Sequence, residues 1–149
     1  MPETRPPRTE RGTCPTREPH PIVTELRARR REAGLSQRAV ANAIHYSHPA
    51  VTFWESGANR PYLDAVAAYA AVLGCRLVLG DSGEPIIDVL RQHRLDAGLR
   101  QSDVAVRLDC VLMTVNRWET GRRGLNLAAA SEYAALFGLA LELREVPDA

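Results

Sequence analysis

The side chains in this sequence that are best suited to chemistry can each form two hydrogen bonds to one ligand group, which is typical of binding rather than of catalysis. Asn116 and Arg117 are adjacent; Asn can form two bonds to an adenine edge, and Arg can do the same with guanine or with a phosphate. By contrast, the acidic residues and the histidines follow no metal-ligand, Ser-His-Asp or phosphate-loop spacing. We therefore expect no enzymatic activity, no cofactor and no bound metal.

These binding groups lie in a stretch that the chain contains twice, 64 residues apart. The stretch predicts two short helices joined by a tight turn, because apolar residues recur at helical spacing on both sides of a polar dipeptide. The matching pairs are Leu35 with Leu99, Gln37 with Gln101, Val40 with Val104, Ala41 with Ala105, Val51 with Val115, Trp54 with Trp118, Glu55 with Glu119 and Gly57 with Gly121. A repeat of this length is typical of duplicated compact domains rather than of a solenoid.

Length and composition set the limits of the fold. The 149 residues suffice for one ordinary domain or for two small ones of about 60 residues each. No apolar run approaches the roughly 20 residues of a membrane span, and the first residues lack an apolar leader segment. We therefore expect a cytoplasmic protein that does not contact a membrane.

The cysteines and the charged residues give further limits on the kinds of site that the chain can contain. Cys14, Cys75 and Cys110 are odd in number and far apart, which argues against both a disulfide framework and a zinc site. The net charge is only +1, so overall charge does not by itself indicate nucleic-acid binding. All 19 basic residues are arginine, however, and arginine suits forked contacts to phosphate and guanine.

The expected elements follow the same order in both repeats, which makes the predicted fold mainly helical. Each repeat has four helices followed by one short strand, and the turn inside the helix pair falls at His45 and at Asp109. The expected helices are 22–33, 37–44, 48–56, 63–73, 86–97, 101–108, 112–120 and 127–137, and the expected strands are 75–79 and 139–144. The predicted domains are 22–80 and 86–146, joined by a linker at 81–85.

The first 21 residues form a separate segment. They contain six prolines and four arginines and almost no apolar side chain, so they cannot bury enough surface to offset chain entropy. We expect residues 1–21 to be a disordered arm. Such an arm is a solvated tail, an extension along DNA or the element that binds a protein partner, and the sequence leaves these alternatives open.

The repeated motif resembles the lambda-repressor-like helix-turn-helix domain of the Cro/cI type, also called the Xre family. In the first repeat the resemblance is carried by Leu35, Ser36, Gln37, Ala41, Ile44, Ser47, Val51, Trp54, Glu55, Gly57, Arg60, Pro61, Leu63, Ala70, Leu73 and Gly74. In the second it is carried by Leu99, Gln101, Ala105, Leu108, Val115, Trp118, Glu119, Gly121, Leu127, Ala134 and Gly138. Two departures are the replacement of the turn glycine by His45 and Asp109, and the loss of serine caps at Arg100 and Val111.

This resemblance implies two tandem DNA-binding domains, each of which inserts its third helix into the major groove. The outward positions of those helices are the candidates for contacts to bases: His48, Pro49, Ala50, Thr52, Phe53, Leu112, Met113, Thr114, Asn116 and Arg117. The candidates for contacts to phosphate are Gln37, Arg38, Asn59, Arg60, Arg100, Gln101, Arg122 and Arg123. We expect Trp54 and Trp118 to lie in the core, and Glu55 and Glu119 to brace the scaffold.

Because the two sets of outward residues differ, two docked helices would require two unlike half-sites on the DNA. One chain would then act as a covalent pseudo-dimer, with its two strands paired about a pseudo-twofold axis. Homodimerisation through the C-terminal strands stays open. The leading functional prediction is a sequence-specific transcriptional regulator. The resemblance implies a repressor, because that is the commonest role in the family. The alternatives are an antitoxin or immunity-type regulator with a protein partner, and a protein-interaction module that has lost DNA binding.

Overall fold

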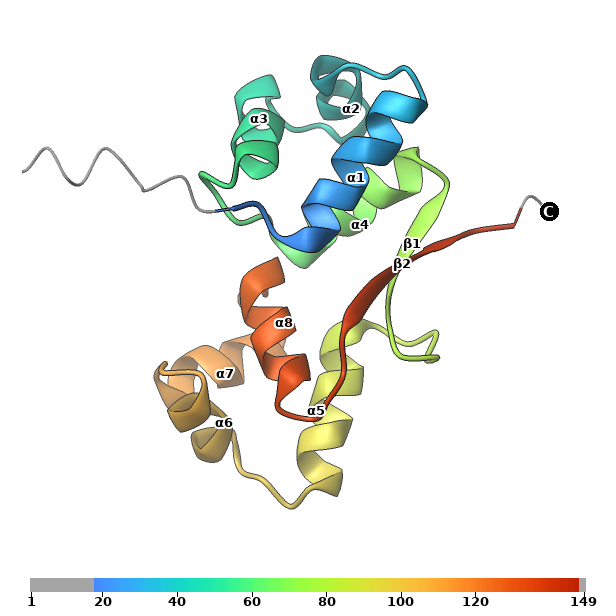
Figure 1. The fold of residues 1–149 in the computed structure, drawn as a ribbon. Coiled ribbons are helices and arrows are strands. Elements are labelled where there is room, and N and C mark those ends of the chain that lie inside the picture. The colour runs from blue at the N-terminus through green and yellow to red at the C-terminus, as the bar shows by residue number, and fades with distance from the viewer. Residues whose placement is uncertain (1–17, 148–149) are drawn as a thin grey trace, which may run out of the picture.

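The computed structural model describes residues 18–147, and it contains eight α-helices and a two-stranded antiparallel sheet within that range. In the first half the elements are α1 (Pro21–Glu32), α2 (Gln37–Ile44), α3 (His48–Ser56), α4 (Leu63–Val72) and β1 (Cys75–Leu79). In the second half they are α5 (Ile86–Asp96), α6 (Gln101–Arg107), α7 (Leu112–Glu119), α8 (Leu127–Ala135) and β2 (Leu141–Glu145) (Figure 1). The predicted mainly helical fold with two tandem helix-turn-helix domains is thus correct.

Some element ends differ from the expectation. The predicted strand at 139–144 begins at Leu141, because Gly138 turns left-handed (φ 70°) and the Leu139 N–H donates to the Ala134 carbonyl at 3.0 Å, which closes α8. The predicted bounds of α2 and α3 are confirmed, and the other helices differ by one or two residues at an end, as is usual where helices fray. Residues 80–85 connect β1 to α5.

The start of α1 bears on the predicted arm at 1–21. Residues 1–17 lie outside the described part of the chain. Pro21 is the first residue of α1, and the His20 ring accepts a hydrogen bond from the Ile22 N–H at 3.1 Å. Because proline at the first helical position is already set for the helix, the end of the predicted arm belongs to the folded part.

The two halves are related by a pseudo-twofold axis that follows the sequence repeat. The central pair of the sheet joins Leu77 to Leu143, and the next pair joins Val78 to Glu142, which are equivalent residues of the two repeats. A second contact, an isolated bridge, joins Tyr62 to its equivalent Asn126. An interface centred on equivalent residues at both points is isologous, as in a twofold dimer.

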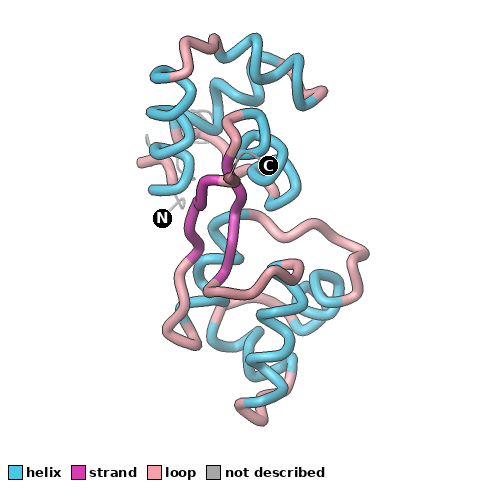
Figure 2. Tube along the Cα trace, turned by 90° about the vertical axis from the view of Figure 1, so that its right-hand side faces the viewer, coloured by secondary structure: helices cyan, strands magenta, loops and turns pink. Residues whose placement is uncertain are grey.

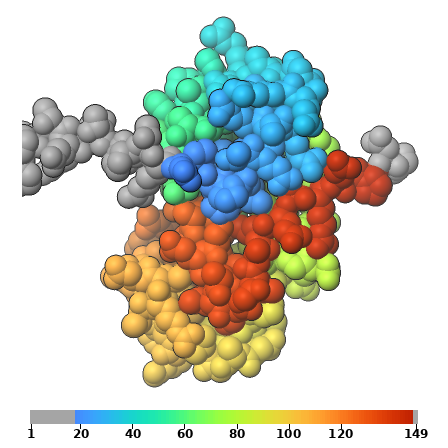
Figure 3. Space-filling model, in the orientation of Figure 1, coloured from blue at the N-terminus to red at the C-terminus, as the bar shows by residue number. Residues whose placement is uncertain are grey.

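Each strand reaches across to the other half. β2 packs against α1, and β1 packs against α5, so each terminal strand covers the first helix of the opposite repeat. The Val146 N–H donates to the Gly74 carbonyl at 2.9 Å, and Arg29 forms an ion pair with Glu145 at 3.3 Å. Figure 2 shows the two strands side by side between the helical halves, and Figure 3 shows the C-terminal strand extending onto the upper half.

The core is continuous across both halves. Leu26, Val51, Tyr69 and Trp54 are buried in the first half, and their counterparts Leu90, Val115, Tyr133 and Trp118 are buried in the second. Leu77, Leu79, Leu141 and Leu143 of the strands join the same cluster. The prediction that both tryptophans belong to the core is confirmed. None of the helices in residues 18–147 is long and apolar enough to cross a membrane.

Candidate nucleic-acid interface

Helices α3 and α7 are each positioned by a tight turn that requires a left-handed residue. His45 adopts φ 61° between α2 and α3, and Asp109 adopts φ 53° between α6 and α7. Both residues can occupy this region, although at a cost compared with glycine. Helices α3 and α7 lie on the same side of the molecule, at the left in Figure 1, whereas the strands cross on the opposite side.

In the first half, Gln37 at the start of α2 is held against α3. Its Oε1 accepts a hydrogen bond from the Thr52 hydroxyl at 2.9 Å and lies 3.3 Å from the His48 Nε2. Its Nε2 donates to the buried Glu55 carboxylate at 3.3 Å. The amide therefore connects an outward face of α3 to the core, and its orientation is set before any ligand arrives.

The second half repeats this arrangement with different residues. Gln101 at the start of α6 accepts a hydrogen bond from the Asn116 amide at 3.3 Å. Asn116 is the equivalent of Thr52, so the same position of the third helix contacts the same glutamine in both halves. A carboxamide offers both a donor and an acceptor to an adenine edge, whereas a threonine offers a hydroxyl and a methyl group.

The remaining candidates for base contacts differ in exposure. Phe53, Leu112 and Met113 are 46%, 51% and 56% exposed, and His48, Pro49 and Arg117 are exposed as well. Thr52, Thr114 and Asn116 are half-buried. Ala50 is half-buried and packs against the core, so only part of its surface is accessible. The outward faces of α3 and α7 share no residue type except threonine.

The candidates for phosphate contacts lie on α2 and α6, directly before α6, and in the loops after α3 and α7. Arg38, Asn59, Arg100, Arg122 and Arg123 are exposed, whereas Gln37, Arg60 and Gln101 are half-buried. Arg100 is within 3.5 Å of Asp103, whose carboxylate also accepts a hydrogen bond from the Arg100 N–H at 2.8 Å. This acidic residue partly replaces the serine cap that the second repeat lacks.

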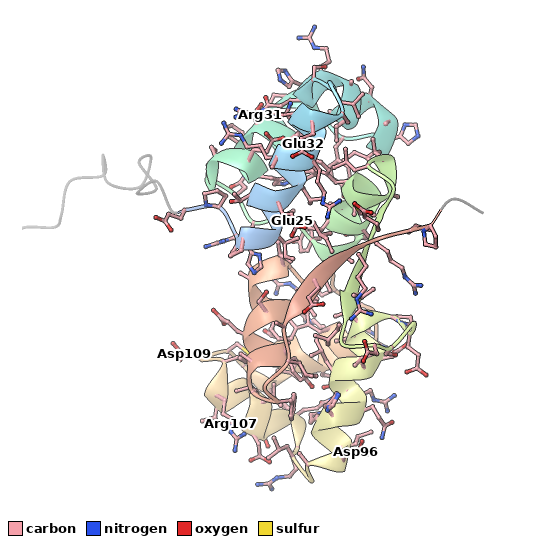
Figure 4. All side chains as sticks on the ribbon, turned by 45° about the vertical axis from the view of Figure 1, so that its right-hand side comes forward. Glu25, Arg31, Glu32, Asp96, Arg107 and Asp109 are labelled. Carbon is pink, nitrogen blue, oxygen red and sulfur yellow. The ribbon has the colours of Figure 1, made fainter. Side chains whose placement is uncertain are left out.

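One exposed cation was missed by the sequence analysis. Arg107 is the last residue of α6, and it projects from the surface beside the Asp109 turn (Figure 4). The equivalent residue in the first half is Ala43, so the repeat gave no signal for it. An arginine beside the turn before α7 adds a further positive charge near this helix.

Each third helix is anchored by a buried ion cluster. In the first half, the Arg30 guanidinium donates to both Glu55 carboxylate oxygens, from Nε at 3.0 Å and from Nη2 at 2.8 Å. The Tyr69 hydroxyl donates to the same carboxylate at 2.8 Å, and Arg30 Nη1 donates to the Leu35 carbonyl at 2.8 Å. α1, α3 and α4 are thereby joined through one carboxylate.

Electrostatics in this cluster keep the carboxylate charged. Burial raises the pKa of Glu55, but the hydrogen bonds from Arg30, Tyr69 and Gln37 outweigh it and hold the pKa below its usual range. Burial and the adjacent carboxylate raise the pKa of Tyr69, so its hydroxyl stays protonated and donates. The pKa of Arg30 is raised by its hydrogen bond to Glu55.

The second half contains the same cluster, formed by Arg94, Glu119 and Tyr133. Arg94 donates to Glu119 from Nη2 at 2.7 Å and to the Leu99 carbonyl at 2.9 Å, and the Tyr133 hydroxyl lies 3.4 Å from Glu119. The prediction that Glu55 and Glu119 brace the scaffold is supported by these contacts. Sequence analysis missed the arginine and tyrosine partners, although both pairs are separated by the same 64 residues.

No group of three metal-ligating side chains comes together within the described residues. In the same part of the chain, Cys75 is a buried free thiol and Cys110 a half-buried one. The site thus consists of hydrogen-bonding, basic and apolar side chains on two helices held by buried clusters.

Comparison with known proteins agrees with this geometry. A family model described as a helix-turn-helix domain matches the chain twice, over residues 22–79 and 88–146. No curated protein and no solved structure gives a significant match. Helix-turn-helix domains are typically DNA-binding and non-enzymatic. With two matches that together span most of its length, this chain belongs to the helix-turn-helix domain family.

Proposed function

We propose that this chain is a sequence-specific DNA-binding transcriptional regulator of the Cro/cI type, from a bacterium or its phage, and that it acts as a repressor, as members of that family most often do. In this proposal it acts in the cytoplasm, on the nucleoid, and has no enzymatic role. The observation that carries the proposal is the placement of α3 and α7 on one side of a molecule whose halves are related by a pseudo-twofold axis. Two recognition helices so related suit successive major grooves, about 34 Å apart, on one face of the duplex.

The two unlike helices predict an unlike pair of half-sites. Asn116 and Arg117 of α7 would hydrogen-bond to adenine and guanine edges, whereas Thr52 of α3 would contact a thymine methyl group. The exposed arginines and the two glutamines, Gln37 and Gln101, would bind phosphates and fix the position of each helix. Since both strands already pair within the chain, a homodimer through the C-terminal strands would have to use their outer edges.

The test is the selection of bound sequences from a random duplex library, followed by titration of the selected duplex at several salt concentrations. We expect two different half-motifs about one helical turn apart, and a logarithm of affinity that falls linearly with the logarithm of salt concentration. A palindromic motif would instead indicate a homodimer that contacts bases through one repeat. No enrichment and no affinity at low salt would overturn the proposal.

Single substitutions assign the half-sites. Arg117→Ala is expected to weaken binding by about 5- to 150-fold, on the basis of roughly 1–3 kcal/mol for a paired contact, and to relax the preference in one half-motif only. Thr52→Ala is expected to relax the other half-motif. Arg144→Ala is the matched control, because this exposed arginine lies on β2, on the opposite side from α3 and α7.

A second candidate function is suggested by apolar exposure on the second repeat. Val106, Val111, Leu112 and Met113 are 80%, 67%, 51% and 56% exposed, and they lie on α6, on α7 and between them. Such a surface favours a protein-interaction module. An antitoxin-type regulator that also binds a protein through its N-terminal arm is the other form of this alternative. This alternative predicts a protein partner whose binding is insensitive to salt. For a protein-interaction module that has lost DNA binding, it also predicts no affinity for DNA.

A further inference from the structure

A cavity of about 550 Å³ lies between the two halves. Its volume is in the range of small-molecule sites, which are typically about 300–1,000 Å³ and mostly apolar. Both halves contribute walls: α4 and β1 from the first, and the start of α5, the end of α7 and the following loop from the second. The principal apolar lining residues are Leu63, Leu77, Ile86, Ile87, Trp118 and Leu125.

The cavity can be compared with the equivalent place in the other half, because the halves are related by a pseudo-twofold axis. At the equivalent place in the other half, the His20 ring spans from α1 to α8. It accepts a hydrogen bond from the Ile22 N–H at 3.1 Å and lies 2.7 Å from the Ser131 hydroxyl. The residue equivalent to Ser131 is Ala67, which lines the cavity and has no hydrogen-bonding side chain.

The residue equivalent to His20 does not span the cavity either. It is Glu84, which lines the cavity but whose carboxylate forms no hydrogen bond or ion pair with any residue of 18–147. The start of α5 accordingly has Pro85 as its cap and no side-chain acceptor for its first N–H groups. The aromatic ring and the acceptor that close one side of the interface are therefore both absent on the other.

The polar groups around the cavity indicate the chemistry of a ligand. Arg76 and Arg123 line it, and neither forms an ion pair with a carboxylate of the described residues. The Arg76 guanidinium is held in place by a hydrogen bond from Nη2 to the Gly83 carbonyl at 2.7 Å. Two arginines beside the uncapped, positive end of a helix favour an anionic group.

The acidic groups restrict the ligand further. Asp64 and Glu84 also line the cavity, so a ligand with two negative charges would be repelled, whereas a donor such as a hydroxyl or an N–H would be accepted. We propose that this cavity binds a small, mainly apolar organic monoanion that carries a hydrogen-bond donor. Its apolar body would take the place that the His20 ring fills on the other side.

Such a ligand would hold α4 of one half against the end of α7 of the other, because both line the cavity. If the chain binds DNA as proposed, occupancy would then change the operator affinity by the same factor by which the operator changes ligand affinity. This regulatory consequence rests on the proposed function, whereas binding of the ligand does not.

The test uses the full chain without DNA and two fluorescent probes. The first probe, 8-anilinonaphthalene-1-sulfonate, has aromatic rings, one N–H donor and one negative charge. The second, N-phenyl-1-naphthylamine, has the same rings and donor but no charge. We expect the sulfonate to bind with a stoichiometry of one, and the uncharged probe to bind about tenfold more weakly.

Two pairs of matched variants locate the site. Ala67→Phe places a ring in the cavity and is expected to weaken sulfonate binding at least tenfold, whereas Ala71→Phe, one turn further along α4 and also exposed, should not change it. Arg76→Gln should weaken the sulfonate severalfold and leave the uncharged probe unaffected. Arg144→Gln removes the same charge from the cross-strand partner of Arg76 and is its control.

Melting temperatures of all four variants measure whether each one is folded. The proposal is overturned if the unaltered protein binds no sulfonate, if Ala67→Phe binds it as well as the unaltered protein does, or if both phenylalanine variants lose it equally. A failure of DNA selection would leave this result intact, so the two proposals are tested separately.

Discussion

The buried carboxylate of Glu55 gives the most direct test of how α3 is held. In Glu55→Gln one oxygen becomes an NH₂ group, which must face donors already aimed at it by Arg30 and Tyr69. Arg30 is 7% exposed and residue 55 is 3% exposed, so water cannot replace the lost acceptor. The guanidinium is then left buried without its counter-charge.

The expected cost follows from the bonds that are lost. Whichever oxygen becomes the NH₂ group, Glu55 loses one charged hydrogen bond from Arg30 and one further bond, from Tyr69 or from Gln37. A hydrogen bond to a charged group contributes about 1.5–3 kcal/mol, and breaking a buried ion pair by changing one partner costs about 3–5 kcal/mol. We expect Glu55→Gln to lower the free energy of unfolding by about 3–5 kcal/mol.

Urea unfolding followed by circular dichroism measures this change. The double variant Arg30→Met/Glu55→Leu is the informative control, because replacing a buried ion pair by apolar residues of similar size is often nearly neutral. It should be more stable than Glu55→Gln alone. The reasoning is refuted if Glu55→Gln costs less than about 1 kcal/mol, which would mean that the cluster is hydrated or that Arg30 finds another acceptor.

The remaining predictions concern the interface and the turns. Burial and Arg60 lower the pKa of His20, so the folded state favours the neutral ring. The contribution of His20 to stability is therefore present above pH ~6.5 and is lost as the pH falls. His20→Gln should reduce the decline in melting temperature between pH 7.5 and 5.5. Leu77→Ala, at a buried cross-strand pair with Leu143, should cost about 2–4 kcal/mol in urea unfolding, and an unchanged midpoint would contradict the sheet register. Asp109→Gly should raise stability by up to about 1 kcal/mol, because glycine removes the left-handed strain; a loss would show that the aspartate is favoured there.

Local features of this fold could be predicted from the sequence because they depend on short-range patterns. The spacing of Val51 and Trp54 identified the buried side of α3, and the break between the two helical patterns located the turn positions His45 and Asp109. The glutamate that follows each tryptophan was predicted to brace the scaffold rather than to meet DNA. Its partners were missed, since Arg30 and Tyr69 lie on other helices and only tertiary packing brings them to Glu55.

The candidate site was predicted as a set of positions but not as a set of contacts. Outward residues on α3 and α7 follow from helical periodicity, so their exposure was predictable. The hydrogen bonds from Thr52 to Gln37 and from Asn116 to Gln101 depend on the angle between two helices, which the sequence pattern does not specify. The half-burial of Ala50 has the same origin, because it depends on what packs beside α3.

The covalent link between the halves explains why the repeats have been able to diverge. In a homodimer, any change at an isologous interface occurs twice, so His20 would face Ser131 on both sides of the axis. Here the backbone contacts keep the twofold pattern, at Val78 with Glu142 and at Tyr62 with Asn126, while the side chains need not. A linker also maintains a high effective concentration of one half near the other, so neither contact must be strong enough to support association. The exposed faces of α3 and α7 are under no twofold constraint either. A chain of this kind can therefore combine two unlike third helices with an interface that is closed on one side and open on the other.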